Sequence, residues 1–172
     1  MIGNDVIDIL QSRKESNWQR KGFIEKIYTL DEQLLITNAA NPETMVWILW
    51  SMKEAAYKVY NRQTKIREYI PKKLVCTIAS YNYNTITGSV ICSGQTFHTI
   101  SILFQDYIHT IAVTHYDDLN KVVEIEKKAV SKDKNDLPYL SNTLQNTIQA
   151  VSVSHHGRFE KVVTISSPTV QS

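Results

Sequence analysis

The chain has 172 residues, with 42% hydrophobic and 21% charged residues, which are ordinary proportions for a soluble globular protein. This length suits one domain or two small subdomains, and no apolar run reaches the roughly 18 residues of a membrane-spanning helix. The net charge of +2 is too small to indicate a nucleic-acid partner. We therefore expect neither a membrane nor a nucleic acid as partner.

Two further features of the composition concern the cellular compartment. Asp5 stands where a signal peptide carries basic and then apolar residues, so we expect a cytoplasmic protein. Cys76 and Cys92 lie in strand-like runs, outside any CxxC motif, and are interpreted as buried reduced thiols.

The N-terminal half has mostly helical patterns. Residues 2–9 are predicted to form a short buried strand, and residues 16–27 a helix with Ser16 as N-cap. Thr29 and Glu32 have the spacing of a capping box, which predicts a helix to about residue 38.

The most regular pattern follows at residues 42–60. Pro42 suits the first turn of a helix, and apolar residues recur from there at helical spacing with a broad buried stripe. This segment is therefore predicted to be a long helix.

Beyond Pro71 the pattern changes to short strands rich in Val, Ile, Thr and aromatic residues. The predicted strands of an antiparallel meander are residues 74–80, 85–92, 96–104 and 108–115. A charged loop is predicted at 126–136, and a second hairpin pairs 150–154 with 159–165. The fold class is therefore α+β, an antiparallel sheet packed against a long helix.

Glu54 and Lys58 share one face of the long helix because they are four residues apart. An ordinary surface ion pair explains such a spacing, but Trp50 and other apolar residues surround both charges. Lys53 supplies a second cation beside Glu54, which favours a compensated carboxylate in an apolar setting.

Asp5 is the second acid in an apolar run. A carboxylate from a strand and another from a helix suit Mg²⁺, which takes one or two protein carboxylates together with water and phosphate oxygens. Asp8 either assists this site or is a simple acid at the end of the strand.

The third candidate is the segment Ser154-His155-His156-Gly157. It is a plain turn, a transition-metal site, or a contact in which His155 and the Ser154 hydroxyl bind a phosphate. Adjacent histidines in a strand rarely face one centre, which argues against the metal reading.

Basic residues cluster in two regions of the sequence, 13–26 and 62–73. Such clusters form either a solvated face or a docking surface for an acidic partner or a phosphate-bearing ligand.

Five segments, taken in order, resemble the signatures of the 4′-phosphopantetheinyl transferase superfamily. They resemble both the holo-acyl-carrier-protein synthases and the larger pseudo-dimeric members. The segments are Gly3-Asn4-Asp5-Val6-Ile7-Asp8, Phe23 to Glu32, Trp50-Ser51-Met52-Lys53-Glu54-Ala55-Ala56-Tyr57-Lys58, Asp136 to Leu140, and Val153 to Phe159. Their order and spacing together are more specific than any one of them alone.

The resemblance implies a fold of this family and transfer of the 4′-phosphopantetheine arm of coenzyme A to a serine of an acyl or peptidyl carrier protein. It implies a Mg²⁺ ion held by Asp5 and Glu54, with Asp8 as a further metal ligand. Glu54 and Lys58 are the catalytic residues that it implies: Glu54, or a metal-bound water, would help to remove the serine proton, and Lys58 would steady the phosphate charge.

For coenzyme A itself, the resemblance implies that Ser154 and His155 meet the 3′-phosphate and that Lys58 contacts the pyrophosphate. Lys53 and Arg62 are further expected contacts. This chain lacks the family's Gly-rich turn after its long helix, and Arg62 or Lys65 would replace the backbone contacts of that turn to the substrate. The basic clusters would then dock an acidic carrier protein.

The length lies between those of the small trimeric synthases and the larger members. We expect one domain over residues 1–172, with a subdivision between 1–118 and 119–172. The His155 segment would complete a site between subunits of a homo-oligomer, or return to the chain's own N-terminal strand in a monomer. The alternative function is a non-catalytic module that binds coenzyme A or a carrier protein.

Overall fold

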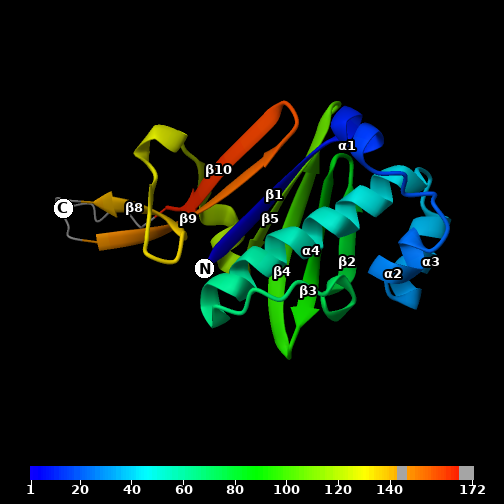
Figure 1. Cartoon of the computed structure of the whole chain (residues 1–172), viewed down its shortest axis with the longest axis horizontal. Helices are drawn as coiled ribbons and strands as arrows, with labels where there is room; N and C mark the ends of the chain where they lie inside the picture. Colours follow the sequence, from blue (N-terminus) through cyan, green and yellow to red (C-terminus); the bar gives the residue numbers. More distant parts are fainter. Residues whose placement is uncertain (143–146, 167–172) are drawn as a thin grey trace.

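The protein is described here by a computed structural model that covers residues 1–142 and 147–166. It contains two five-stranded sheets with antiparallel pairing and one long helix, which confirms the predicted α+β class (Figure 1). The strand orders are β1-β5-β4-β3-β2 in the first sheet and β6-β10-β9-β8-β7 in the second. Over the described ranges, no helix combines the length and the apolar character needed to span a membrane.

The chain begins with β1 (Ile2–Asp8), every residue of which is buried. Gly3 permits this burial, since a Cβ at that position would collide with the backbone of the long helix. Helix α1 (Ile9–Glu15) follows at once, with Asp8 as its N-cap.

The prediction of a helix over residues 16–27 is wrong. Helix α1 starts earlier because Asp8, not Ser16, accepts hydrogen bonds from the first free amides of the helix, and Ser16 is its C-cap. Only α2 (Phe23–Ile27) lies inside the predicted range, after Gly22 with a φ of 82°.

The two following helices confirm their predictions. Helix α3 (Leu30–Asn38) has the complete Thr29–Glu32 capping box, and α4 (Pro42–Thr64) begins with Asn41 as N-cap and proline in its first turn. Helix α4 ends where Lys65 takes a φ of 62°, a left-handed conformation that glycine usually supplies.

The meander is also confirmed, to within one or two residues at each strand end. After the short 3₁₀ helix η1 (Pro71–Lys73), its strands are β2 (Val75–Asn82), β3 (Thr85–Cys92), β4 (Gln95–Leu103) and β5 (Tyr107–Val113). Strand β1 joins this sheet as the antiparallel neighbour of β5, so the first strand of the chain lies beside the last strand of the meander.

The second sheet is built from shorter strands. It is preceded by the 3₁₀ helix η2 (Tyr116–Lys121) and contains β6 (Val122–Glu124), β7 (Ser131–Lys132), β8 (Pro138–Asn142), β9 (Thr147–His156) and β10 (Phe159–Ile165). The predicted loop at 126–136 thus contains β7 and the 3₁₀ helix η3 (Lys127–Ala129). The predicted C-terminal hairpin is confirmed as β9 and β10.

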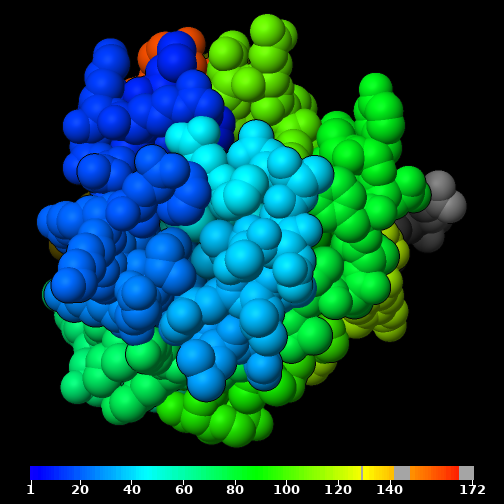
Figure 2. Space-filling model, turned by 90° about the vertical axis from the view of Figure 1, so that its right-hand side faces the viewer, coloured from blue at the N-terminus to red at the C-terminus, as the bar shows by residue number. Residues whose placement is uncertain are grey.

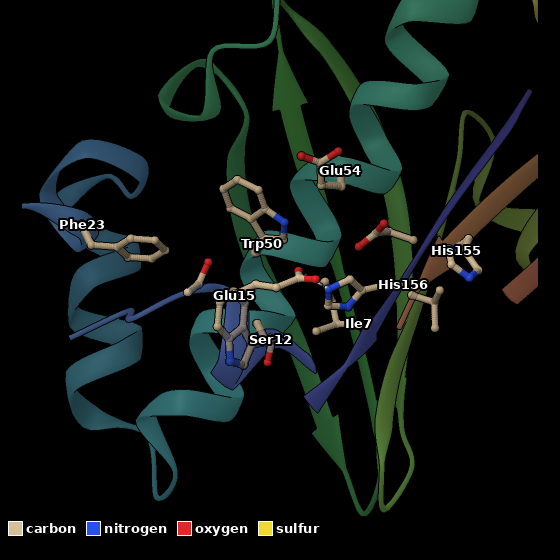
Figure 3. A pocket seen from close by; sticks show the side chains of 12 residues that line it. Ile7, Ser12, Glu15, Phe23, Trp50, Glu54, His155 and His156 are labelled. Atoms are coloured by element: carbon tan, nitrogen blue, oxygen red, sulfur yellow. Dashed lines mark hydrogen bonds and ion pairs between the residues drawn. The ribbon is translucent and has the colours of Figure 1, made fainter. Parts of the chain in front are cut away.

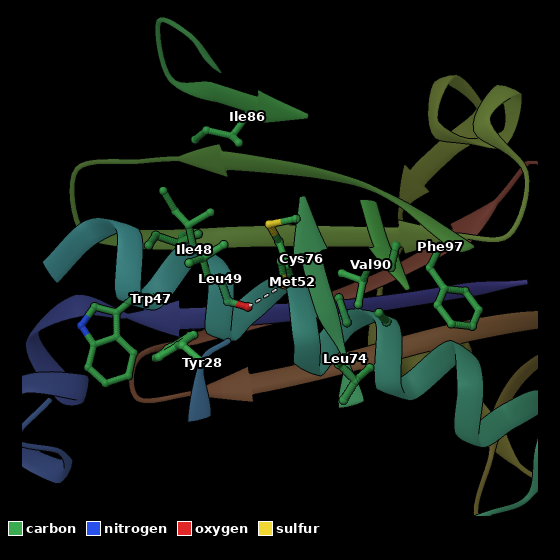
Figure 4. Close-up of a cluster of buried hydrophobic side chains, with 14 of the residues drawn as sticks. Tyr28, Trp47, Ile48, Leu49, Met52, Leu74, Cys76, Ile86, Val90 and Phe97 are labelled. Carbon is green, nitrogen blue, oxygen red and sulfur yellow. Dashed lines mark hydrogen bonds between the residues drawn. The ribbon is translucent and has the colours of Figure 1, made fainter. Parts of the chain in front are cut away.

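The main core lies between α4 and the first sheet (Figure 4). It contains apolar side chains of α4 together with those facing them from the strands, and α2 and α3 close it at one side, on the face shown in Figure 2. A smaller cluster of Ile2, Ile111, Val113 and Val163 joins the first sheet to β10. Burial of these apolar surfaces supplies the main stabilising free energy of such a fold.

Strand β9 pairs with β1 through its side chains, which accept hydrogen bonds from the backbone amides of β1. The amides of Asn4, Val6 and Asp8 donate hydrogen bonds to Ser152 Oγ (2.8 Å), Ser154 Oγ (3.0 Å) and His156 Nδ1 (2.9 Å), respectively. Alternate residues of β9 therefore satisfy the edge of β1 that β5 leaves free.

Candidate functional site

A cavity of about 260 Å³ lies where β1, α1, α4 and the end of β9 meet (Figure 3). Its wall carries three carboxylates, two histidines and a group of aromatic side chains. These residues are Asp5, Glu15, Glu54, His155, His156, Phe23, Trp47 and Trp50. Residues from both ends and the middle of the chain thus share one cavity.

Asp5 projects from the centre of β1 and is buried. Its Oδ1 accepts a hydrogen bond from Ser154 Oγ at 3.1 Å and lies 3.7 Å from Lys58 Nζ. Its Oδ2 is buried and has no hydrogen-bond partner among the described residues. Burial raises the pKa of Asp5, and the Lys58 charge opposes this effect.

Glu54 reaches the same cavity from α4 and is half-buried. Its pKa is raised first by burial and then by the neighbouring Asp5 charge. Two carboxylates that disfavour each other's ionisation, one with an unpaired buried oxygen, form an arrangement that a divalent cation would stabilise.

The donor set fits Mg²⁺ rather than a metal held wholly by protein ligands. The described residues contain no group of three or more His, Cys, Asp or Glu side chains placed to hold an ion. Mg²⁺ commonly uses one or two carboxylates and completes its octahedron with water and substrate phosphates. Asp5 and Glu54 are thus compatible with this ion.

Tyr69, Trp50 and Tyr57 pack together beside Glu54. The Tyr69 ring meets those of Trp50 and Tyr57 edge-on, at centroid distances of 6.0 and 4.9 Å. Burial and the Glu54 charge both raise the pKa of Tyr69. The Tyr69 phenol therefore lies close to the Glu54 charge, a neighbour that no local sequence pattern indicated.

Lys58 lies between the two sheets, with its side chain about one third exposed (32%). Its ammonium donates to Asn4 O at 2.7 Å and, more weakly, to Val153 O at 3.4 Å. The lysine therefore places a positive charge beside Asp5 and fastens β1 to β9.

Asp8 has a structural role that the sequence interpretation as a metal ligand did not foresee. Its carboxylate accepts from the amides of Leu10 and Gln11, and from the amide, Nε and Nη2 of Arg158. Arg158 holds the pKa of Asp8 well below its usual range. Both carboxylate oxygens are thus occupied by hydrogen-bond donors, which argues against the expected role of Asp8 as a metal ligand.

Lys53 also lies elsewhere than the sequence analysis predicted, away from Glu54 and the cavity. Its ammonium is fully buried and donates to both Glu32 carboxylate oxygens, at 2.7 and 2.9 Å, and to two backbone carbonyls. Neighbouring helix residues point in different directions, so Lys53 enters the core while Glu54 faces the cavity. Lys53 therefore pairs with Glu32 in the core and does not compensate Glu54.

The His155 segment returns to the N-terminal strand of its own chain, as one of the two hypotheses expected. His155 is exposed at the cavity. His156 is held in place, with Asp8 N donating to Nδ1 and Nε2 lying 3.0 Å from Glu15 Oε2. Ser154 is buried against Asp5 and Val6.

Arg62 lies farther along α4, outside the first cavity. Its guanidinium donates to Pro138 O at 3.2 Å and to Val151 O at 2.5 Å. It lines two further hollows, of about 180 and 370 Å³, beside β8 and β9. Arg62 thus lies beside β8 and β9, away from the cavity that Asp5 and Glu54 line.

The contacts of Ser152 and Arg158 were not anticipated. The alternation Ser152-Val153-Ser154-His155-His156 puts polar acceptors on one side of a strand, and this signal could have indicated an interface with another strand. No local pattern identifies β1 as that partner.

In a comparison with protein families, residues 1–112 match the model of the 4′-phosphopantetheinyl transferase superfamily (ACPS). Comparison with curated proteins gives no matching relative. The matched range includes β1, α4 and the meander, whereas the His155 segment lies beyond it.

Proposed function

Since the chain belongs to the 4′-phosphopantetheinyl transferase superfamily, we propose that it transfers the phosphopantetheine arm of coenzyme A to a serine of an acyl or peptidyl carrier protein. The observation that carries this proposal is the pair of carboxylates, Asp5 and Glu54, on one cavity, with Asp5 Oδ2 buried and unpaired among the described residues.

Asp5 and Glu54 are the residues that would hold Mg²⁺. When bound, the ion would neutralise charge on the pyrophosphate of coenzyme A during its displacement. The same two residues without an ion would repel a pyrophosphate, so we expect binding of coenzyme A to depend on a divalent cation.

The proposed step is an in-line displacement at the phosphorus that carries the pantetheine arm. The serine oxygen of the carrier protein forms a bond to this phosphorus, and the bond to the bridging oxygen of the pyrophosphate breaks. That oxygen leaves with its electron pair on adenosine 3′,5′-bisphosphate. The serine proton passes to a base.

Glu54 is the proposed base, acting directly or through a water molecule. Without a metal ion, burial and the charge of Asp5 raise the pKa of Glu54, and a bound ion would oppose this effect. Trp50, Tyr57 and Tyr69 restrict solvent on one side of this group.

Three side chains, those of Lys58, His155 and Arg62, are proposed to bind coenzyme A. Lys58 lies next to Asp5, and its weak 3.4 Å contact to Val153 O is the one that a phosphate oxygen would replace. His155, exposed at the rim, is the proposed contact of the 3′-phosphate. Arg62 would meet the part of the nucleotide that extends along α4.

An acidic carrier protein suits the exposed basic residues beside the cavity. The N-terminal helices and the loop between them expose five cations. They are Arg13, Lys14, Arg20, Lys21 and Lys26. Charge complementarity of this kind mainly raises the rate of encounter, so transfer should slow as ionic strength increases.

The direct test is the intact mass of an apo carrier protein incubated with the chain, coenzyme A and Mg²⁺. We expect the carrier to gain one phosphopantetheine arm, and a chelator to prevent the gain. Coenzyme A binding with no gain on fatty-acid, polyketide and peptide-synthesis carriers would contradict the proposal and favour the non-catalytic binding module.

A further inference from the structure

We propose that Ser154 is a positioning residue that orients Asp5 towards the metal ion, and not a contact of the coenzyme A phosphate. This inference rests on the proposed function, because it assigns a role within the same site. It gives the second sheet a part in assembling a metal site whose two carboxylates both come from the first 112 residues.

The hydrogen bonds of Ser154 carry the inference. Its side chain is buried, accepts from Val6 N at 3.0 Å and donates to Asp5 Oδ1 at 3.1 Å. A serine hydroxyl has a single donor, and a phosphate oxygen accepts hydrogen bonds. Since Asp5 takes that donor, the hydroxyl has none left for a phosphate.

The bond to Ser154 also fixes the orientation of the Asp5 carboxylate. Ser154 and Lys58 both lie on the side of Oδ1, at 3.1 and 3.7 Å, and Oδ2 is left unpaired among the described residues. Hydrogen bonds of this kind to a metal ligand hold its orientation and typically change metal affinity 10- to 100-fold when they are removed.

Ser152 provides a matched control within the same strand. It is also buried and accepts a hydrogen bond from a β1 amide, that of Asn4 at 2.8 Å, but among the described residues it makes no hydrogen bond to Asp5. Replacing either serine by alanine removes one hydrogen bond from a β1 amide, and Ser154→Ala removes in addition the bond to the Asp5 carboxylate.

The test measures Mn²⁺ binding to the full-length protein by electron paramagnetic resonance, which counts free ion and needs no turnover. We expect Ser154→Ala to raise the Kd for Mn²⁺ by about tenfold or more and Ser152→Ala to leave it near the wild-type value. Equal Kd values for wild type and Ser154→Ala would overturn the inference, as would an equal loss in both variants.

A second readout separates positioning from phosphate binding. The preference for coenzyme A over 3′-dephospho-coenzyme A should be unchanged in Ser154→Ala and reduced in His155→Ala. A preference lost in Ser154→Ala would show that Ser154 reads the phosphate and would overturn the inference.

A substitute variant and the wild-type measurements separate the possible outcomes. If Ser154→Ala fails to fold, Ser154→Cys keeps the volume with a weaker donor, and a wild-type Kd for Mn²⁺ in that variant counts against the inference. If the wild type neither binds Mn²⁺ nor modifies a carrier, the proposed function fails. If it does both and Ser154→Ala binds Mn²⁺ normally, only the role of Ser154 fails.

Discussion

Asn4 precedes the proposed metal ligand Asp5, and its buried side-chain amide determines the protonation state of His109. Its Nδ2 donates to Lys161 O at 3.1 Å, which fixes the orientation of the amide, and the same nitrogen lies 3.2 Å from His109 Nε2. His109 Nε2 must therefore accept a hydrogen bond from the Asn4 amide, so the ring is neutral and carries its proton on Nδ1.

This arrangement predicts a loss of stability on mild acidification. Burial, with Lys161 as the next cause, lowers the pKa of His109 to about 4, below the ordinary value near 6.5. The unfolded chain therefore binds more protons between these values, and the free energy of unfolding should fall by up to about 3 kcal/mol as the pH drops from 7 to 4.

The measurement is urea denaturation at several pH values for wild type and His109→Gln, which keeps an acceptor for Asn4 but has no proton to gain. The slope of stability against pH over this window should be smaller in the variant. Equal slopes would show that His109 is not the group responsible.

At the scale of elements, Asp8 joins the end of β1 to the start of α1 and to the tip of the β9–β10 hairpin. Gly157, with a φ of 54°, forms this tip and leaves room for the Asp8 carboxylate, and Arg158 closes over it. One side chain thus caps a helix and anchors a hairpin about 150 residues away in the sequence.

Two substitutions separate these roles. Asp8→Asn keeps an N-cap acceptor but loses the charge that holds Arg158, whereas Asp8→Ala loses both. We expect Asp8→Ala to be less stable than Asp8→Asn by about 1 kcal/mol in thermal or urea unfolding. Both should bind Mn²⁺ like the wild type, and weaker Mn²⁺ binding by folded Asp8→Asn would restore Asp8 as a metal ligand.

Lys53 and Glu32 form a buried ion pair whose hydrogen bonds join four elements. The buried pair connects α4 to the start of α3. Lys53 also donates to the carbonyls of Pro71 in η1 and of Leu74 after it, and Glu32 accepts from the amide of Cys76 in β2. Every charged atom has a partner, so the pair is tolerated in the core.

Removing one partner of the Lys53–Glu32 pair should lower the free energy of unfolding. Lys53→Met leaves the Glu32 charge buried without a counter-ion, and we expect a loss of about 3–5 kcal/mol in the free energy of unfolding. Lys121→Met, which removes the exposed ion pair with Asp118, should cost less than about 1 kcal/mol. Similar small losses in both variants would refute a structural role for Lys53.

Elements that depend on local spacing could be predicted from the sequence, and those that depend on distant partners could not. The capping box at Thr29, the helix from Pro42 and the meander strands depend on local spacing, and the structure confirms them. The start of α1 was missed because the Asp8 side chain serves as both cap and hairpin anchor. Lys53 was misassigned because a core partner 21 residues away cannot be read from the helix pattern.

At the scale of the whole molecule, the site depends on contact between the two sheets. Strand β1 is the edge of the first sheet, and β9 satisfies its free amides with side chains while Lys58 connects both strands. Asp5, Glu54 and Lys58 were predicted as one site, and the structure places Asp5 next to Lys58 and both acids on one cavity. The contact between β9 and β1 lay beyond local patterns, which do not specify a distant partner strand.

The proposed two-carboxylate site requires Glu54, so substitution of Glu54 tests it. The measurement is the rate at which an apo carrier protein gains the phosphopantetheine arm, followed by intact mass, with wild type, Glu54→Gln and Glu15→Gln. Glu15 lines the same cavity but bonds to Gln11 and His156, so it controls for loss of a cavity carboxylate. We predict a rate at least about 100-fold lower for folded Glu54→Gln and a rate close to wild type for Glu15→Gln. Unchanged turnover in Glu54→Gln would contradict the account.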